Sequence, residues 1–333
     1  MNPETAKRLE ESIQKTLLTH AKNNKSYLWM AYWVIFEREA DPEGMAMFLN
    51  QLTEGLTRPT LIAKMIESNE FQHRLPPGTQ SFASTESKVL IELDKFKIYA
   101  MTNDTAVGQT IISTRSYEPH VTDAIVNHLK AGDVFLDLGA NIGYFTMLAA
   151  SIVKEAGKVI SFEPNQYNRQ LLYASIVENQ FKNITVYPFA VSDSQQILRL
   201  MTSGSNGWVV ELSDESVNYQ FVQSVILDEL LESEKKINVV KIDIEGHEPI
   251  ALRGMDKIIK KHRPIILTEF HPYAVGEGYL KQLTEYNYRL FIIEEVGKIL
   301  EAPDTAFVME FWQRLVEKVN FDRIHLDLMA LPL

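Results

Sequence analysis

The chain has 333 residues, of which 45% are hydrophobic and 23% charged, an ordinary balance for a globular protein and a length that suits two domains. Its 33 basic and 44 acidic residues give a formal net charge of −11 without any dense run of Lys or Arg, which argues against nucleic acid as a partner. The absence of cysteine excludes disulfides, thiolate nucleophiles and zinc–sulfur sites. The polar N-terminus and the lack of any apolar run of ~20 residues predict a cytoplasmic protein without a transmembrane segment.

The sequence divides at residues 76–87, a stretch rich in Pro, Gly and small polar residues that we interpret as a linker. Residues 1–75 are predicted to form an all-helical module, because apolar side chains recur there at helical spacing, for example from Leu28 to Phe36. Residues 88–333 have a different pattern and are predicted to form a second domain.

Strand-like and helical segments alternate in this second domain. The predicted strands are Val134–Leu138, Val159–Phe162, Thr185–Phe189, Val239–Ile244 and Ile265–Phe270. Such alternation requires right-handed crossover connections and a mostly parallel sheet. A hairpin is expected before these strands, within residues 89–100, and an antiparallel pair after them, at 289–293 and 324–331. The predicted fold class is therefore α/β, with a doubly wound sheet.

The strongest motif is VFLDLGANIGYFTMLAA, residues 134–150. A strand ends at Asp137, a turn contains Gly139 and Gly143, and a helix begins near Tyr144. The glycines let the backbone approach a ligand closely, and the helix N-terminus presents free N–H groups. The spacing is not the G-x-G-x-x-G of dinucleotide sites, and Asp137 would repel a pyrophosphate, so a nicotinamide-dependent oxidoreductase is disfavoured. The motif favours a ligand with a cationic amino-acid end, such as S-adenosylmethionine.

Acidic residues follow the next two strands. Glu163, in Ser161-Phe162-Glu163-Pro164, comes 24 residues after Gly139. This is near the offset of ~20 residues at which an acidic side chain accepts ribose hydroxyls. Asp193 is a candidate for the adenine amino group, and a simple Asx turn explains it equally well.

Polar side chains crowd the ends of two further strands, in KIDIEGHE (residues 241–248) and TEFHP (residues 268–272). Open α/β sheets bind ligands at this edge, and neighbouring strands lie ~4.8 Å apart, so we expect one cluster. The candidate catalytic residues are Asp243, Glu245, His247, Glu269 and His271. Helix capping is the alternative for the carboxylates, and a polar loop position for a histidine.

These motifs, together with Ser116-Tyr117-Glu118-Pro119, resemble the FkbM-type family of class I methyltransferases over residues 88–331. The resemblance implies a Rossmann-like seven-stranded sheet with one antiparallel strand near an edge. It implies S-adenosylmethionine as the cofactor and O-methylation of a sugar hydroxyl, of bacterial polysaccharide or glycolipid type, or of a polyketide hydroxyl. The residues placed at the cofactor are Glu118, Asp137, Gly139, Asn141, Gly143, Glu163, Asp193 and Asp243.

The N-terminal stretch of residues 31–72 resembles a helical module of unknown function that is often attached to bacterial glycan-assembly proteins. The module is either a plain helical cap on the catalytic domain or a surface that docks the enzyme to a glycan-synthesis protein partner.

An alcohol acceptor is barely ionised at neutral pH and benefits from a general base. In one version of the mechanism, His271 or His247 takes the proton and is oriented by Glu245 or Glu269. In the other version, Asp243 and Glu269 hold Mg²⁺, which polarises the sugar hydroxyls. We favour the metal-free version, because two of only eight histidines fall at this edge.

The glycine- and serine-rich segment at residues 202–208 is predicted to be a loop over the acceptor. Within it, Asn206 and Trp208 are candidates for acceptor binding. Trp208 either stacks on a sugar ring or is a buried core residue. A non-catalytic glycan-binding or scaffolding protein on the same fold is the alternative from another functional class.

Overall fold

The computed structural model describes residues 24–36, 40–68, 88–105, 107–203, 205–210, 219–319 and 324–333. The chain divides into two compact units, residues 1–88 with 185–188 and residues 89–184 with 189–333, and each is described by itself. The predicted linker at 76–87 lies outside the described residues, as do residues 1–23 and 69–75 of the predicted helical module. None of the described helices is both long and apolar enough to cross a bilayer.

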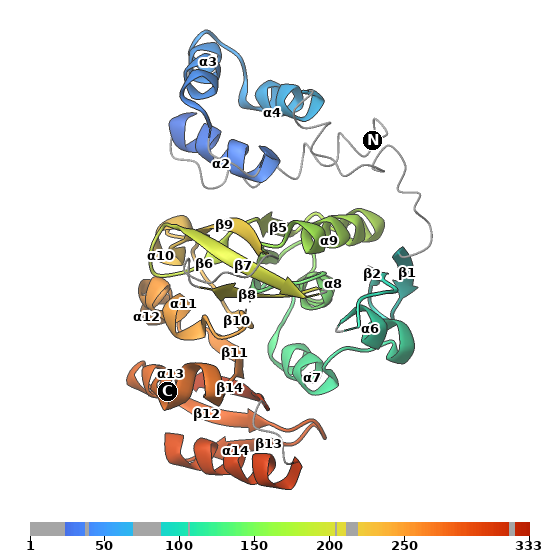
Figure 1. Cartoon of the computed structure of the whole chain (residues 1–333), viewed down its shortest axis with the longest axis vertical. Helices are drawn as coiled ribbons and strands as arrows, with labels where there is room; N and C mark the ends of the chain where they lie inside the picture. Colours follow the sequence, from blue (N-terminus) through green and yellow to red (C-terminus); the bar gives the residue numbers. More distant parts are fainter. Residues whose placement is uncertain are drawn as a thin grey trace. The chain divides into compact units, whose positions relative to one another are not determined.

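The N-terminal unit is helical where it is described (Figure 1). Its helices are α2 (Asn24–Phe36), α3 (Pro42–Thr53) and α4 (Arg58–Glu67). Asp41 caps α3 by accepting a hydrogen bond from the Gly44 N–H at 2.7 Å, which satisfies one of the free donors at the start of the helix. Tyr27 is fully buried, and its hydroxyl donates to the Arg58 carbonyl at 3.1 Å, so a polar bond joins α2 to α4.

One large mixed sheet has the strand order β13-β12-β14-β11-β10-β3-β4-β5, and all of its strands except most of β5 belong to the second unit. The strands, in chain order, are β3 (Val134–Leu138), β4 (Lys158–Phe162), β5 (Ile184–Tyr187), β10 (Val239–Ile242), β11 (Ile265–Phe270), β12 (Tyr288–Ile293), β13 (Ile299–Ala302) and β14 (Leu326–Pro332). In Figure 1, β12, β14, β11 and β10 follow one another upward from the lower end of the view.

The pairing directions confirm the predicted doubly wound α/β class. Strands β11, β10, β3 and β4 pair in parallel, whereas β14 runs antiparallel to β11 and β12. The sheet has one strand more than the seven expected, because a turn at Gly297 returns the chain as β13 along β12. β3 and β11 have the bounds that their apolar runs predict.

Helices connect the strands of the large sheet. They are α8 (Tyr144–Val153), α9 (Gln166–Asn179), α10 (Leu227–Leu230), α11 (Glu248–Gly254), α12 (Asp256–His262), α13 (Pro272–Glu285) and α14 (Thr305–Val319). The helical segment between β10 and β11 is broken into α11 and α12, because Met255 leaves the helical conformation with φ −127° and ψ 25°. Before β3 come the short strands β1 (Lys88–Glu92) and β2 (Lys97–Met101), which pair in the predicted hairpin, and the helices α6 (Gly108–Thr114) and α7 (Pro119–His128).

A second, four-stranded sheet has the order β6-β9-β7-β8. Its strands are β6 (Ala190–Val191), β7 (Ile197–Ser203), β8 (Asn206–Val210) and β9 (Tyr219–Val225). The prediction of a loop at residues 202–208 is therefore wrong, because this segment contains the last residues of β7 and the first residues of β8, which pair with each other. The alternate residues Leu198 and Leu200 of β7 are buried with Val222 of β9, and this apolar cluster fixes the hairpin despite its glycine- and serine-rich tip.

Candidate active site

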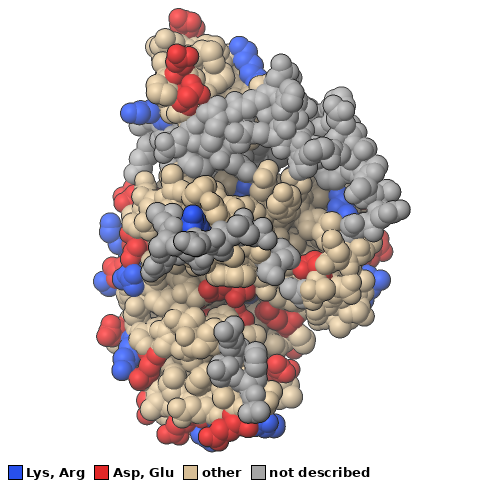
Figure 2. Space-filling view, in the orientation of Figure 1, with Lys and Arg blue, Asp and Glu red and all other residues tan. Residues whose placement is uncertain are grey.

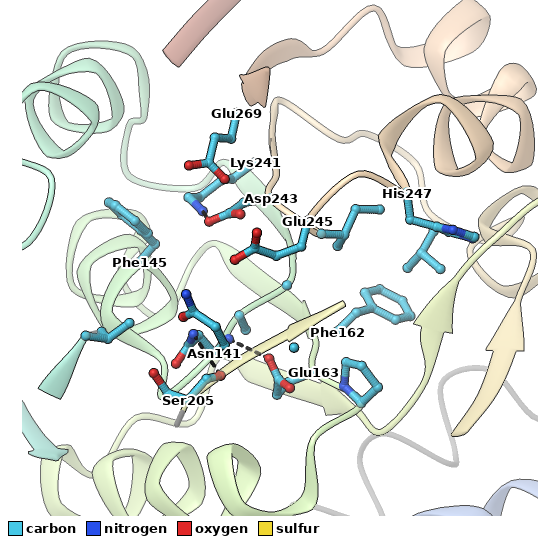
Figure 3. A pocket seen from close by; sticks show the side chains of 18 of the residues that line it. Asn141, Phe145, Phe162, Glu163, Ser205, Lys241, Asp243, Glu245, His247 and Glu269 are labelled. Carbon is cyan, nitrogen blue, oxygen red and sulfur yellow. Dashed lines mark hydrogen bonds and ion pairs between the residues drawn. The ribbon is translucent and has the colours of Figure 1, made fainter. Parts of the chain in front are cut away.

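The carboxyl ends of β3, β4, β10 and β11 open onto one cavity of about 350 Å³, the size of a cofactor or small-ligand site. This is the edge at which open α/β sheets bind ligands. Side chains from the turn after β3, from the hairpin β7–β8 and from the start of α13 complete the lining. Figure 3 shows two groups that face each other across the cavity, Asn141 with Glu163 on one side and Lys241, Asp243 and Glu269 on the other.

The glycine turn after β3 is packed tightly against the end of β10. Gly139 has φ +84°, and a Cβ at this position would lie 1.8 Å from the Asp243 carbonyl oxygen, so only glycine fits. The N–H groups of Gly139 and Ala140 both donate to the Phe162 carbonyl at 3.0 Å. Backbone, rather than side chain, therefore lines this part of the cavity.

Glu163 lies at the end of β4 and is only 5% exposed. Its carboxylate accepts hydrogen bonds from the N–H groups of Asn141 at 2.6 Å and Asn165 at 2.7 Å. Burial raises the pKa of Glu163 to about 7, and the two backbone bonds oppose that rise. Each carboxylate oxygen has a further lone pair, so the fixed group remains able to accept the hydroxyls of a ribose.

The tip of the β7–β8 hairpin is held over the cavity by polar side chains of other elements. The Ser205 carbonyl accepts from Asn141 Nδ2 at 3.2 Å and from Asn168 Nδ2 at 2.7 Å, and the Ser205 N–H donates to Asp104 at 3.4 Å. Asn206, the next residue along the hairpin, is one of the residues that line the cavity. Trp208 is not among the lining residues, since on β8 it faces away from Gly207 and Val209, which do line the cavity.

Two predicted cofactor residues support the glycine turn from beneath and do not line the cavity. Asp137 is fully buried, and its Oδ2 accepts the Thr146 hydroxyl at 2.6 Å, which ties β3 to α8; burial raises the pKa of this carboxyl. Gly143 has φ +98°, and a Cβ there would lie 2.9 Å from Leu172 Cγ. Both residues shape the turn that Gly139 and Asn141 present to the ligand.

Apolar side chains form part of the cavity lining, here called the apolar slot, and a surface of this kind suits the flat face of an adenine ring. The slot is lined by Phe162, Phe189, Val191, Leu200 and Val209. Asp193, the candidate for the adenine amino group, is not part of this slot. Its Oδ2 instead lies 2.8 Å from Arg253 Nε in an ion pair.

Lys241 and Asp243 form a buried ion pair at the end of β10. Lys241 Nζ lies 2.7 Å from Asp243 Oδ2 and 4.7 Å from the centre of the Phe145 ring. Burial would lower the pKa of Lys241, but the charges of Asp243 and Glu118 hold it above its usual value, so the ammonium stays charged. Burial would likewise raise the pKa of Asp243, yet Lys241 keeps it low, so this carboxylate stays ionised. Glu118 also lines the cavity, and burial raises its pKa to about 7.

Glu269, His271 and His325 form a polar cluster beside this pair. His271 Nε2 lies 3.4 Å from Glu269 Oε2, and His325 Nδ1 lies 3.1 Å from Glu269 Oε1. Burial and the charge of Asp243 raise the pKa of Glu269 well above its usual value, so Glu269 holds a proton and shares it with Asp243 in a hydrogen bond. Burial lowers the pKa of His271, so the imidazole is neutral near pH 7.

This arrangement does not favour magnesium. Lys241 already binds the Asp243 oxygen that Mg²⁺ would need, and two of the three ligand-type atoms around Glu269 are imidazole nitrogens, whereas Mg²⁺ prefers oxygen. The cluster suits proton transfer instead.

The last two candidates of the KIDIEGHE motif point in different directions. The Glu245 carboxylate extends into the cavity (Figure 3) and lies 4.0 Å from His271 Nε2; burial raises the pKa of Glu245 to about 7. His247 lies at the right of the view in Figure 3, apart from Lys241, Asp243 and Glu269, and its Nε2 is 3.3 Å from the Ser192 hydroxyl. Burial lowers the pKa of His247, which stands apart from the carboxylates.

Reasoning from the sequence did not name several polar or aromatic lining residues, among them Tyr117, Lys241, Tyr273 and His325. Lys241 is the first residue of the KIDIEGHE motif and Tyr273 directly follows TEFHP, and a charged residue in an otherwise apolar strand was a usable signal for Lys241. His325 is 54 residues from His271, and only the antiparallel pairing of β14 with β11 brings the two together.

Comparison with known proteins agrees with this geometry. Residues 137–302 match the model of the methyltransferase FkbM domain, and residues 11–75 match a domain of unknown function, DUF4214. The hexuronic acid methyltransferase AglP of Haloferax volcanii is 29% identical over 175 residues, which are 50% of this chain and 68% of that protein.

Solved structures with a similar fold include methyltransferase FkbM from Methylobacillus flagellatus, at 15% identity over 92% of this chain and 62% of that chain (TM-score 0.39). Another is Aeropyrum pernix fibrillarin with natively bound S-adenosyl-L-methionine, at 12% identity over 74% of this chain and 94% of that chain (TM-score 0.39). The family matches together show that the chain contains an S-adenosylmethionine-dependent methyltransferase domain of the FkbM type, preceded by a DUF4214 domain of unknown function.

Proposed function

We propose that this methyltransferase acts on a hydroxyl group of a sugar or glycan, with His271 as the base that receives the hydroxyl proton. The observation that carries the proposal is that one cavity joins the glycine turn and Glu163 to a neutral, buried histidine. The similarity to a protein named as a hexuronic acid methyltransferase supports a sugar acceptor over a polyketide hydroxyl.

The cavity fits the cofactor. The absence of a Cβ at Gly139 leaves room beside the turn, Glu163 offers a fixed carboxylate for a ribose, and the apolar slot accepts an adenine. S-adenosylmethionine, when bound, supplies a methyl group on a sulfonium whose leaving group is already good. The acidic residues around the cavity favour its positive charge, and what remains for the protein is alignment and removal of a proton.

His271 is suited to remove that proton. Its pKa is lowered by burial, so the imidazole is in the basic form near neutral pH. Glu269 is protonated and is held by Asp243, so it does not compete for the acceptor proton. When His271 becomes charged, Glu245 at 4.0 Å is near enough to stabilise the imidazolium.

Tyr273 replaces Trp208 as the candidate aromatic platform for the sugar. It lines the cavity from the start of α13 and is 51% exposed. The Tyr273 and His271 rings pack edge to face, with their ring centres 5.4 Å apart, so a sugar that stacks on Tyr273 would lie beside the proposed base.

The direct test is transfer of an isotope-labelled methyl group to a panel of simple glycosides and nucleotide sugars, read by mass spectrometry. The His271→Ala variant should lose about 10²–10⁴-fold in kcat while its affinity for S-adenosylhomocysteine is unchanged. His128→Ala is the control, because His128 lies at the end of α7 and is not among the lining residues. Full turnover by the His271 variant would remove this residue from the mechanism.

A further inference from the structure

The lining of the cavity is strongly acidic. Its five carboxylate residues are Glu118, Glu163, Asp243, Glu245 and Glu269. Lys241 is the one Lys or Arg among the described lining residues, beside three histidines. Acidic side chains also gather in the hollow near the middle of the face shown in Figure 2. This excess of acidic over basic side chains suits a cofactor with a sulfonium and an ammonium group, and it constrains the acceptor as well.

Lys241 cannot act as the partner of an anionic acceptor. It is 4% exposed, and its Nζ is held 2.7 Å from Asp243 Oδ2. Drawing the ammonium away would leave the Asp243 carboxylate buried without a counter-charge, which is costly. The pair is therefore a closed unit within the wall of the cavity.

Two of the three histidines in the lining, His271 and His247, cannot supply the positive charge in place of Lys241. Burial lowers the pKa of both His271 and His247, so both are neutral near pH 7. His325 Nδ1 lies 3.1 Å from Glu269 Oε1 and is already engaged there. Among the described lining residues, no fixed positive charge is left for a second ligand.

We propose, building on the sugar O-methylation proposed above, that the sugar ring which receives the methyl group is neutral or an amino sugar, and that a free uronate is rejected. A uronate carboxylate beside Tyr273 would face the Glu245 carboxylate, and no cation of the described lining is free to bind it. Repulsion of this kind selects among sugars of the same shape, because discrimination can come from the partner that is excluded. This chain would then differ in acceptor from the relative that is named for hexuronic acid.

The test compares matched nitrophenyl glycosides that differ at one carbon: glucoside against glucuronide, and galactoside against galacturonide, with glucuronamide as the neutral twin of the uronate. The expected result is a kcat/KM at least tenfold higher for the neutral member of a pair. The ratio should shrink as salt is added, because ions screen the repulsion. Equal rates, or a preference for the uronate, would overturn the inference.

Replacing Glu245 tests whether this carboxylate causes the discrimination against uronates. Glu245→Gln should bring the ratio between neutral and uronate sugars closer to one, whatever it does to the absolute rates. Glu155→Gln should leave the ratio unchanged, because Glu155 is an exposed residue after α8 and is not part of the lining. An unchanged ratio in the Glu245 variant would count against the inference. Methylation of no sugar, with S-adenosylhomocysteine binding intact, would instead refute the proposed sugar acceptor itself, and this outcome is distinct from a preference for uronates.

Discussion

Replacing Gly139 by alanine tests whether the backbone turn after β3 positions the active site. The residue has φ +84°, where an L-residue costs about 1–2 kcal/mol. The added Cβ would lie 1.8 Å from the Asp243 carbonyl oxygen, whereas ordinary contact begins at 3.4 Å, so the ends of β3 and β10 would have to separate by about 1.6 Å. With overpacking included, we expect a loss of about 2–5 kcal/mol in the free energy of unfolding.

A displacement of this size also separates the cofactor side of the cavity from Asp243. Because a misplacement of about 1 Å can cost 10²-fold in rate, kcat/KM should fall by at least that factor. Gly132→Ala is the matched control, since Gly132 has φ +88° and a Cβ added there would have nothing within 4 Å. The control should show the backbone strain alone, measured as a small fall in Tm, with unchanged kcat/KM.

The decisive comparison is the affinity for S-adenosylhomocysteine, measured by calorimetry on folded protein of both variants. If Gly139→Ala binds it as tightly as Gly132→Ala and turns over normally, the close contact between the turn and β10 does not position the site, and the reasoning fails.

Three further predictions concern the polar residues of the cavity. Glu163→Ala should weaken S-adenosylhomocysteine binding at least ~tenfold, because two N–H groups lose their charged acceptor along with the ribose contact; calorimetry that shows wild-type affinity would contradict this. With a Glu245 pKa of about 7, kcat/KM should rise with pH through that value as the carboxylate ionises, and in Glu245→Gln this limb should disappear; a retained limb would assign it to another group. Methyl transfer should survive dialysis against EDTA within about twofold, whereas a loss that Mg²⁺ restores would favour the metal-assisted version.

The class of the fold and the position of the cofactor site follow from local patterns. Apolar runs of strand length alternate with helical segments, and β3, β4, β10 and β11 each have an acidic residue within one residue of their carboxyl end. Parallel strands bring those ends to one edge, so the sequence predicts that Gly139, Glu163, Asp243 and Glu269 lie together, and all four line the cavity. The prediction failed at residues 202–208, because a glycine- and serine-rich hairpin tip has the composition of a loop.

What the tertiary structure alone decided is the role of each polar group in the cluster. The sequence grouped Asp137 with the ligand, but its burial against Thr146 makes it a support for the turn. His247 and His271 look alike in the chain, and only packing turns the first toward Ser192 and the second toward Glu269. The charge and the protonation of each group depend on its burial and on neighbours from distant parts of the chain, such as His325 beside Glu269. A local sequence pattern does not determine which distant residues become neighbours.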